Sequence, residues 1–157
     1  MAQGILLAFF LAAALVFFLP RLFHISQHVV LSGSMEPAIR TGSLCFIDHR
    51  AGLGEIREGD AVAFERIDGS LVVHRAVREE KGQFVTRGDA NPAEDLARVT
   101  KENYLGKAVL SVPYLGYAVM FLQRREVKAA AGILAAAFFL KELLSAINKE
   151  GKPYEKT

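Results

Sequence analysis

The sequence contains few cysteines and has a small net charge. It contains one cysteine, no tryptophan, and 19 lysine and arginine residues against 17 aspartate and glutamate residues. A single cysteine excludes an intrachain disulfide framework and a metal site built from several thiolates. The net charge of +2 gives no electrostatic support for nucleic acid as a partner. Glycine-rich phosphate-binding motifs are also absent from the sequence, so we expect no nucleotide, no other cofactor and no metal.

Two apolar segments lie near the ends of the chain. Residues 4–19 carry no charged side chain, and together with residues 20–25 they reach about 20 residues, enough to cross a hydrocarbon core of about 30 Å. No lysine or arginine precedes this run, and it continues beyond the small residues 12–14, where a cleaved signal peptide would become polar. We therefore predict an uncleaved transmembrane anchor over residues 1–25, with a cleavable signal peptide as the alternative.

The second apolar segment, residues 129–140, is shorter and has charged residues on both sides. With snorkelling lysines, residues 127–147 fit a transmembrane span, but they also fit a helix that lies flat at the membrane interface. We expect an apolar helix and a polar tail over residues 124–157, and basic residues after both apolar runs leave the orientation open.

Between these segments, residues 26–123 have the pattern of one β-rich domain. Short apolar or alternating runs at residues 44–47, 61–64, 71–73, 83–86 and 104–112 predict strands, and glycine-containing turns separate them. Asp68 and Gly69 lie between two of these runs, which favours a β-hairpin. The predicted fold class is therefore mainly β, with a membrane helix before the domain and a transmembrane or interfacial helix after it.

Three polar segments of this domain carry residue types used in acyl transfer. Ser34 follows a glycine and precedes a Met-Glu-Pro turn, which leaves its hydroxyl unobstructed. His74 falls in an apolar strand, and Asp89 and Asp95 follow Gly88 in a predicted loop and short helix. A serine nucleophile needs a base, and the base needs a carboxylate that orients it.

Each of these residues also has an ordinary structural interpretation. A serine between small residues is typical of a turn, a histidine on an apolar strand is typical of a satisfied core residue, and aspartates after a glycine are typical of turns and helix N-caps. The spacing of the three segments does not show that they meet.

The order of these segments resembles that of the type I signal peptidases, a membrane-bound serine protease family. Residues 32–39 (SGSMEPAI) resemble its nucleophile box, and residues 57–64 (REGDAVAF) resemble its Gly-Asp-x-Val strand box. Residues 71–75 (LVVHR) correspond to the segment that carries the base, and residues 88–91 (GDAN) resemble the terminal box. The likeness runs roughly from residue 5 to residue 115, and boxes in the right order are a far more specific signal than any one of them.

The resemblance implies a signal-peptidase-like β domain in which Ser34 is the nucleophile. Ordinary bacterial members carry a lysine as base, whereas His74 is similar to the base of the endoplasmic-reticulum-like branch found in eukaryotes, archaea and some Gram-positive bacteria. Asp95 would then orient His74, with Asp89 as a supporting carboxylate, although the sequence leaves open which aspartate has which role. The Ser32 hydroxyl would join the backbone N–H of Ser34 in an oxyanion hole.

The same resemblance implies a membrane-bound serine endopeptidase that removes N-terminal signal peptides from secretory preproteins. The expected partners are these preproteins and the lipid bilayer of the cell or endoplasmic reticulum membrane, with the active site on the extracytoplasmic side. Whether partner subunits are needed stays open. Two alternatives differ in class: a self-cleaving repressor-type protease, which would need a DNA-binding segment at the front, and a non-enzymatic membrane-tethered β-module.

Two further candidates are set aside. Cys45 lies in an apolar run, where a free cysteine acts as a small hydrophobic residue more often than as a nucleophile. His24 and His28 would lie one helical turn apart, but no third metal ligand is evident, so we interpret them as interfacial residues at the end of the anchor.

Overall fold

The computed structural model describes residues 8, 11, 15 and 19–150, without the side chains of residues 143 and 145–150. Within this range the chain divides into two compact units, with the boundary between Tyr117 and Ala118. The first unit holds an antiparallel β-sheet, which confirms the predicted mainly β class. Most of the anchor predicted over residues 1–25 lies outside the described residues.

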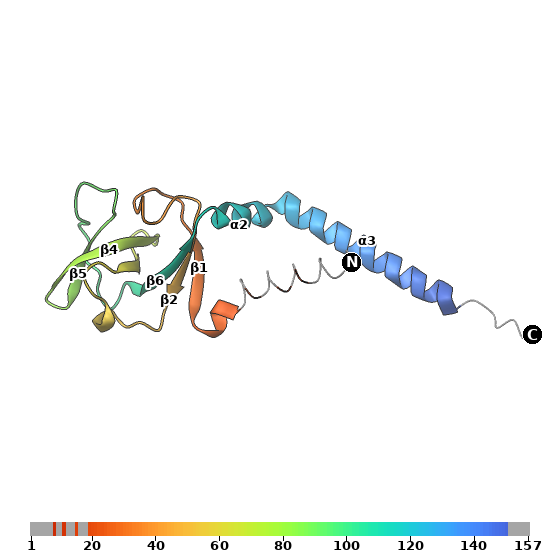
Figure 1. Ribbon diagram of the computed structural model, residues 1–157, viewed down its shortest axis with the longest axis horizontal. Coiled ribbons are helices and arrows are strands. Elements are labelled where there is room, and N and C mark those ends of the chain that lie inside the picture. The colour runs from red at the N-terminus through yellow and green to blue at the C-terminus, as the bar shows by residue number, and fades with distance from the viewer. Residues whose placement is uncertain (1–7, 9–10, 12–14, 16–18, 151–157) are drawn as a thin grey trace, which may run out of the picture. The chain divides into compact units, whose positions relative to one another are not determined.

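The described sheet has six strands in the order β1-β2-β6-β3-β4-β5, and each neighbouring pair is antiparallel (Figure 1). The strands are β1 (Ile25–Val29), β2 (Leu44–Asp48), β3 (Ala61–Glu65), β4 (Leu71–Glu80), β5 (Gln83–Arg87) and β6 (Tyr104–Val112), and a short 3-10 helix, η1 (Leu53–Glu55), follows β2. Because β6 lies between β2 and β3, the sheet joins segments that are far apart in the sequence.

All five predicted strand runs form strands, and the predicted hairpin joins β3 to β4. In its turn, the carboxylate of Asp68 accepts hydrogen bonds from the backbone N–H and the hydroxyl of Ser70. Gly69 has a φ of 77°, a left-handed conformation that glycine adopts without a steric penalty. Local turn chemistry therefore explains why the chain reverses at this point.

Alternation along β3 and β4 divides the buried side chains between the two faces of the sheet. One cluster contains Val62, Phe64 and Ala76, and the other contains Ala63 together with Met35. His74 is 7% exposed, and its ring contacts the Phe64 ring edge-on, with 6.2 Å between the ring centroids. The His74 ring thus lies on the same apolar face of the sheet as Phe64, as the alternation along β4 predicts.

The segment around His28 corrects one sequence interpretation. His28 lies in strand β1, not one helical turn after His24, and His24 has a positive φ of 57°. The His28 Nε2 atom is 2.9 Å from Ser26 Oγ, which is 2.6 Å from His49 Nε2. Hydrogen-bonded strand pairing with β2 thus takes the place of a continued helix here.

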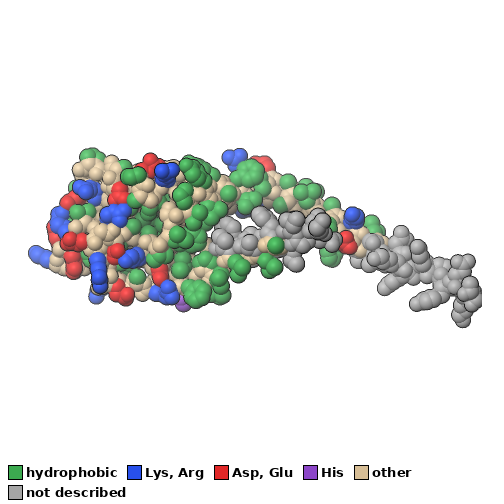
Figure 2. Space-filling view, viewed as in Figure 1, with side chains coloured by type: hydrophobic (Ala, Val, Ile, Leu, Met, Phe, Trp, Pro, Cys, Tyr) green, Lys and Arg blue, Asp and Glu red, His purple; other side chains and the backbone are tan. Residues whose placement is uncertain are grey.

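Two helices follow the sheet, α2 (Leu115–Gln123) and α3 (Arg125–Glu150). Within the described part of the chain, no helix combines the length and the apolarity that a membrane crossing requires. On the face of the molecule seen in Figure 2, charged side chains gather over the part of the sheet that carries β4 and β5, and hydrophobic side chains gather towards β1.

Candidate active site

The side chains of Ser34, His74 and Asp95 form a hydrogen-bonded chain. Ser34 Oγ lies 3.1 Å from His74 Nε2, and His74 Nδ1 lies 2.6 Å from Asp95 Oδ2. The serine comes from the turn after β1, the histidine from the middle of β4 and the aspartate from the loop after β5. Groups from three distant stretches of sequence therefore meet within direct hydrogen-bonding distance.

The aspartate determines which nitrogen of the neutral ring carries the proton. A carboxylate only accepts hydrogen bonds, so His74 Nδ1–H donates to Asp95 Oδ2 and leaves a lone pair on Nε2. That lone pair faces the Ser34 hydroxyl. The buried Thr86 hydroxyl donates a second hydrogen bond of 2.7 Å to Asp95 Oδ2, and together the two donors hold the carboxylate in place.

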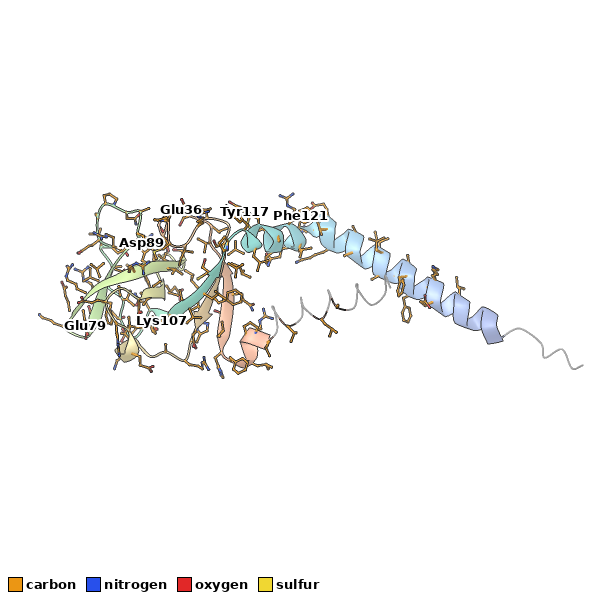
Figure 3. The ribbon with its side chains drawn as sticks, in the orientation of Figure 1. Glu36, Glu79, Asp89, Lys107, Tyr117 and Phe121 are labelled. Carbon is orange, nitrogen blue, oxygen red and sulfur yellow. The ribbon has the colours of Figure 1, made fainter. Side chains whose placement is uncertain are left out.

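A close backbone contact brings the serine turn against the loop that carries the aspartates. Ala90 N–H donates to the carbonyl oxygen of Ser34 at 2.9 Å. At Gly88, an added Cβ would lie 2.5 Å from that same oxygen, so the approach requires a glycine. Figure 3 labels Glu36 and Asp89, which mark these two neighbouring loops.

The three acidic residues of this loop have three different partners. Asp95 contacts His74, whereas Asp89 forms a two-pronged ion pair with Arg75, through Nε at 2.7 Å and Nη2 at 2.5 Å. Glu94 pairs with Arg78. The segment from residue 89 to residue 97 consists of turns and bends, so the short helix expected there is wrong.

Arg75 connects this loop to the rest of the sheet. Its Nη1 donates to the carbonyl of Gly59 at 2.7 Å while its other nitrogens hold Asp89. The hydrogen bonds to Asp89 raise the pKa of Arg75 above its ordinary value, so the guanidinium stays charged over the physiological range. Asp89 therefore positions the loop and makes no hydrogen bond to the histidine.

Ser32 and Cys45 occupy different surroundings. Ser32 Oγ is exposed and lies 3.4 Å from Ser34 Oγ, which puts a second hydroxyl beside the first. Cys45 is fully buried among core residues, and burial raises the pKa of its thiol to about 11. A thiol of this kind stays protonated and inaccessible, as its apolar sequence context predicts.

Across the described residues, no three His, Cys, Asp or Glu side chains are arranged to hold a metal ion.

Two cavities adjoin β4 where it carries the histidine. The smaller one, of about 160 Å³, is lined by Ser32, Ser34 and the apolar residues Val30, Met35, Leu71 and Val73. The larger one, of about 790 Å³, is lined by His74, Asp95 and other residues of the loop, and by the turn between β3 and β4. Only Val72 borders both, so β4 separates a space beside the serine from a space beside the histidine and aspartate.

Sequence reasoning did not identify two of the residues that shape this region. Thr86 holds Asp95, and the only signal for it was a hydroxyl residue directly after the apolar pair Phe84 and Val85. His28 lines the smaller cavity. Burial and the neighbouring His49 lower the pKa of His28, which favours its neutral form in this wall.

Comparison with known proteins places the chain in a family. Residues 3–96 match the family model described as signal peptidase, peptidase S26. The chain is 37% identical over 106 residues to the signal peptidase complex catalytic subunit sec11 of Sclerotinia sclerotiorum, and the match covers 60% of this chain and 62% of the relative. It is 36% identical over 108 residues to SEC11 of Candida tropicalis, covering 60% and 63% of the two chains.

A longer match extends to SEC11 of Eremothecium gossypii, with 34% identity over 128 residues that cover 71% of this chain and 75% of the relative. The chain spans less than two thirds of the length of the first two relatives. The family match nevertheless covers more than half of the chain and includes the Ser34 turn, His74 and Asp95. The chain belongs to the signal peptidase family, peptidase S26.

Proposed function

We propose that this protein is a membrane-bound serine endopeptidase that removes N-terminal signal peptides from secretory preproteins. The observation that carries the proposal is the continuous hydrogen-bonded chain from Ser34 Oγ through His74 to Asp95. This chain supplies a nucleophile, a base and an orienting carboxylate in the order that acyl transfer requires. All three groups come from one polypeptide, so the chemical step needs no residue from a partner subunit.

In the first half of the reaction, Ser34 Oγ attacks the carbonyl carbon at the cleavage site and His74 Nε2 accepts the hydroxyl proton. The tetrahedral intermediate collapses as the C–N bond breaks, and His74 gives the proton to the leaving amine. In the second half, water attacks the acyl-enzyme and gives a proton to His74. The serine hydroxyl is restored, and the signal peptide leaves with a free carboxylate.

Charge develops on the carbonyl oxygen during both steps and needs hydrogen-bond donors. We assign these donors to the backbone N–H of Ser34 and the hydroxyl of Ser32, whose Oγ lies 3.4 Å from the nucleophilic oxygen. Donors held in place before the reaction stabilise a developing oxyanion without reorganisation. Asp95 stabilises the imidazolium that forms at the same time, because it already accepts the His74 Nδ1–H bond.

The edge of β4 offers a place for a substrate strand. Strand β5 pairs with β4 only from Arg75 onward, so in the described sheet no strand covers that side of Leu71 and Val73. Ala76 makes both of its backbone hydrogen bonds on the β3 side. Because the direction of these groups alternates from one residue to the next along a strand, the N–H and C=O groups of Leu71 and Val73 point to the opposite side, away from β3. An extended peptide could pair there, with small side chains entering the smaller cavity.

We also propose that the apolar N-terminal segment anchors the enzyme in a membrane, with the site on the extracytoplasmic side. Exposed apolar side chains near β1 support this arrangement, among them Leu22, Phe23 and Leu31, which are 75%, 51% and 73% exposed. Apolar patches of this kind are typical of surfaces that meet lipid or protein. Confinement to the bilayer would raise the effective concentration of substrates that carry their own apolar segment.

The test is cleavage of a purified preprotein by the full-length protein and by two serine variants. Ser34→Ala should reduce cleavage by a factor of about 10⁶, as loss of a serine nucleophile does in other proteases. Ser111→Ala, a matched change at a residue of β6 that lines neither cavity, should keep wild-type activity. Equal cleavage by the wild type and Ser34→Ala would exclude Ser34 as the nucleophile.

A further inference from the structure

The side chains of β4 divide between the two cavities in alternation. Val72 and His74 line the larger cavity, of about 790 Å³, whereas Leu71 and Val73 line the smaller one, of about 160 Å³. Val72 packs against the same core cluster as Phe64, which also lines the larger cavity, and Leu71 and Val73 pack against the other cluster. The two cavities therefore lie on opposite faces of the sheet, beside the same stretch of β4.

The larger cavity extends beside the open edge of β4. Its lining begins at His74 and Asp95, continues at Val72, and reaches Ile67 and Asp68 in the turn between β3 and β4. The edge on which the substrate strand is proposed to pair, residues 71–73, lies between these two ends of the lining. The larger cavity thus accompanies the segment that precedes the scissile bond, on the face opposite the smaller cavity.

A peptide strand that pairs with this edge is pleated like β4, so its successive side chains point to opposite faces of the sheet. Ser34, which attacks the carbonyl of the last residue before the bond, lines the smaller cavity and not the larger one. We propose that the larger cavity is a specificity site for the side chain of the second residue before the bond, while the first and third residues face the smaller cavity. This inference rests on the proposed function.

The size and the wall of the larger cavity fit a large apolar side chain. Its volume of about 790 Å³ is within the range of ligand-sized sites in proteins. Phe64, which is 1% exposed, forms part of the wall, and Ile67 and Leu96 line the cavity with side chains that are 102% and 100% exposed. A substrate side chain that covers Ile67 and Leu96 would remove their apolar surface from water, and this burial favours an apolar residue.

The charged groups of the lining are engaged with the protein itself. They are Arg66, Asp68, Glu94 and Asp95. Each carboxylate accepts a hydrogen bond from a side chain of this chain: Asp68 from Ser70, Glu94 from Arg78 and Asp95 from His74. Arg78 thus balances the charge of Glu94. A polar substrate side chain in this cavity would lose water without gaining a dedicated partner, whereas an apolar one has no such penalty.

The experiment uses two pairs of preproteins. In the first pair, the second residue before the scissile bond is leucine or asparagine, which are similar in size. The second pair carries the same exchange at the second residue after the bond. The full-length wild type, the double variant Ile67→Ser/Leu96→Ser and the control Val109→Ser are compared by the ratio of kcat/KM for leucine to that for asparagine. Val109 is a half-exposed residue of β6 that lines neither cavity.

In the first pair, we expect the wild type and Val109→Ser to prefer leucine by about tenfold, a typical discrimination for a change of apolar contact. The double variant should lose most of this preference, and in the second pair its ratio should equal that of the wild type. Because each ratio is taken within one enzyme, a difference in the amount of folded protein does not affect it.

Three results would overturn the inference: no preference of the wild type in the first pair, an undiminished preference of the double variant, or a loss of preference in Val109→Ser as large as in the double variant. A double variant whose ratio changes in the second pair instead would place the cavity after the bond and would overturn it as well. A wild type that cleaves none of the four preproteins would contradict the proposed function itself.

Discussion

At the scale of single residues, the two aspartates after Gly88 have separable roles. Asp95 accepts the His74 Nδ1–H bond, whereas Asp89 holds Arg75 and is not bonded to the histidine. In the proposed mechanism, Asp95 therefore orients the base, and Asp89 holds the loop that carries both aspartates. Substitution of each carboxylate by its amide separates these roles, because the shape is kept while the charge is lost.

We predict that Asp95→Asn lowers kcat by a factor of about 10⁴, because an amide that donates to the ring stabilises the wrong tautomer. Asp89→Asn keeps the histidine hydrogen bond and should cost only about tenfold, through a looser Arg75 contact. Steady-state cleavage of one preprotein by both variants provides the measurement. A larger loss in Asp89→Asn than in Asp95→Asn would exchange the two assignments.

The sequence predicted the residue types of the site, but not which carboxylate faces the base. Six positions separate Asp89 from Asp95, and no local rule orients an irregular loop. The choice depends on long-range partners, since Thr86 holds one aspartate and Arg75 holds the other. These partners lie on β5 and β4 and become neighbours of the aspartates only when the sheet forms.

At the scale of elements, alternation and turn chemistry predicted five of the six described strands. Runs such as residues 61–64 alternate between two apolar clusters, and the Asp68–Gly69 turn determines where the next strand begins. Strand β1 escaped prediction because Ile25–Val29 is short and mixes polar with apolar residues directly after the apolar N-terminal run of the sequence. It is defined by its pairing with β2, which local sequence does not encode.

The contact between the serine turn and the loop after β5 yields a prediction at this scale. In Gly88→Ala, the new Cβ would lie 2.5 Å from the Ser34 carbonyl oxygen and 2.8 Å from Asn91 Nδ2, so the two loops must separate. A displacement of about 1 Å between reacting groups can cost about 10²-fold in rate, and we expect a loss of kcat of that order.

The matched control is Gly54→Ala in η1, where an added Cβ meets nothing within 4 Å. It should retain wild-type kcat. Circular dichroism of both variants checks that the sheet is intact. If Gly88→Ala cleaves a preprotein as fast as Gly54→Ala does, then the close approach of the two loops is not needed for catalysis.

At the scale of the whole molecule, the proposed anchor predicts how the protein partitions. An apolar N-terminal segment that spans the bilayer should keep the full-length chain in the membrane pellet after extraction with alkaline carbonate. Leu11→Arg/Leu15→Arg should lower the retained fraction, because each central arginine costs about 2.5–3.5 kcal/mol on insertion scales. Recovery of the wild type in the supernatant, measured by immunoblot, would contradict the anchor.

The single cysteine has a practical consequence for studying this protein in a membrane. Cys45 is the only thiol in the sequence, it is fully buried, and its pKa is raised to about 11. A maleimide dye applied to the folded protein near neutral pH should therefore leave it unlabelled. A new cysteine on the surface would then be the only attachment point, and fluorescence could follow individual molecules without first building a cysteine-free background.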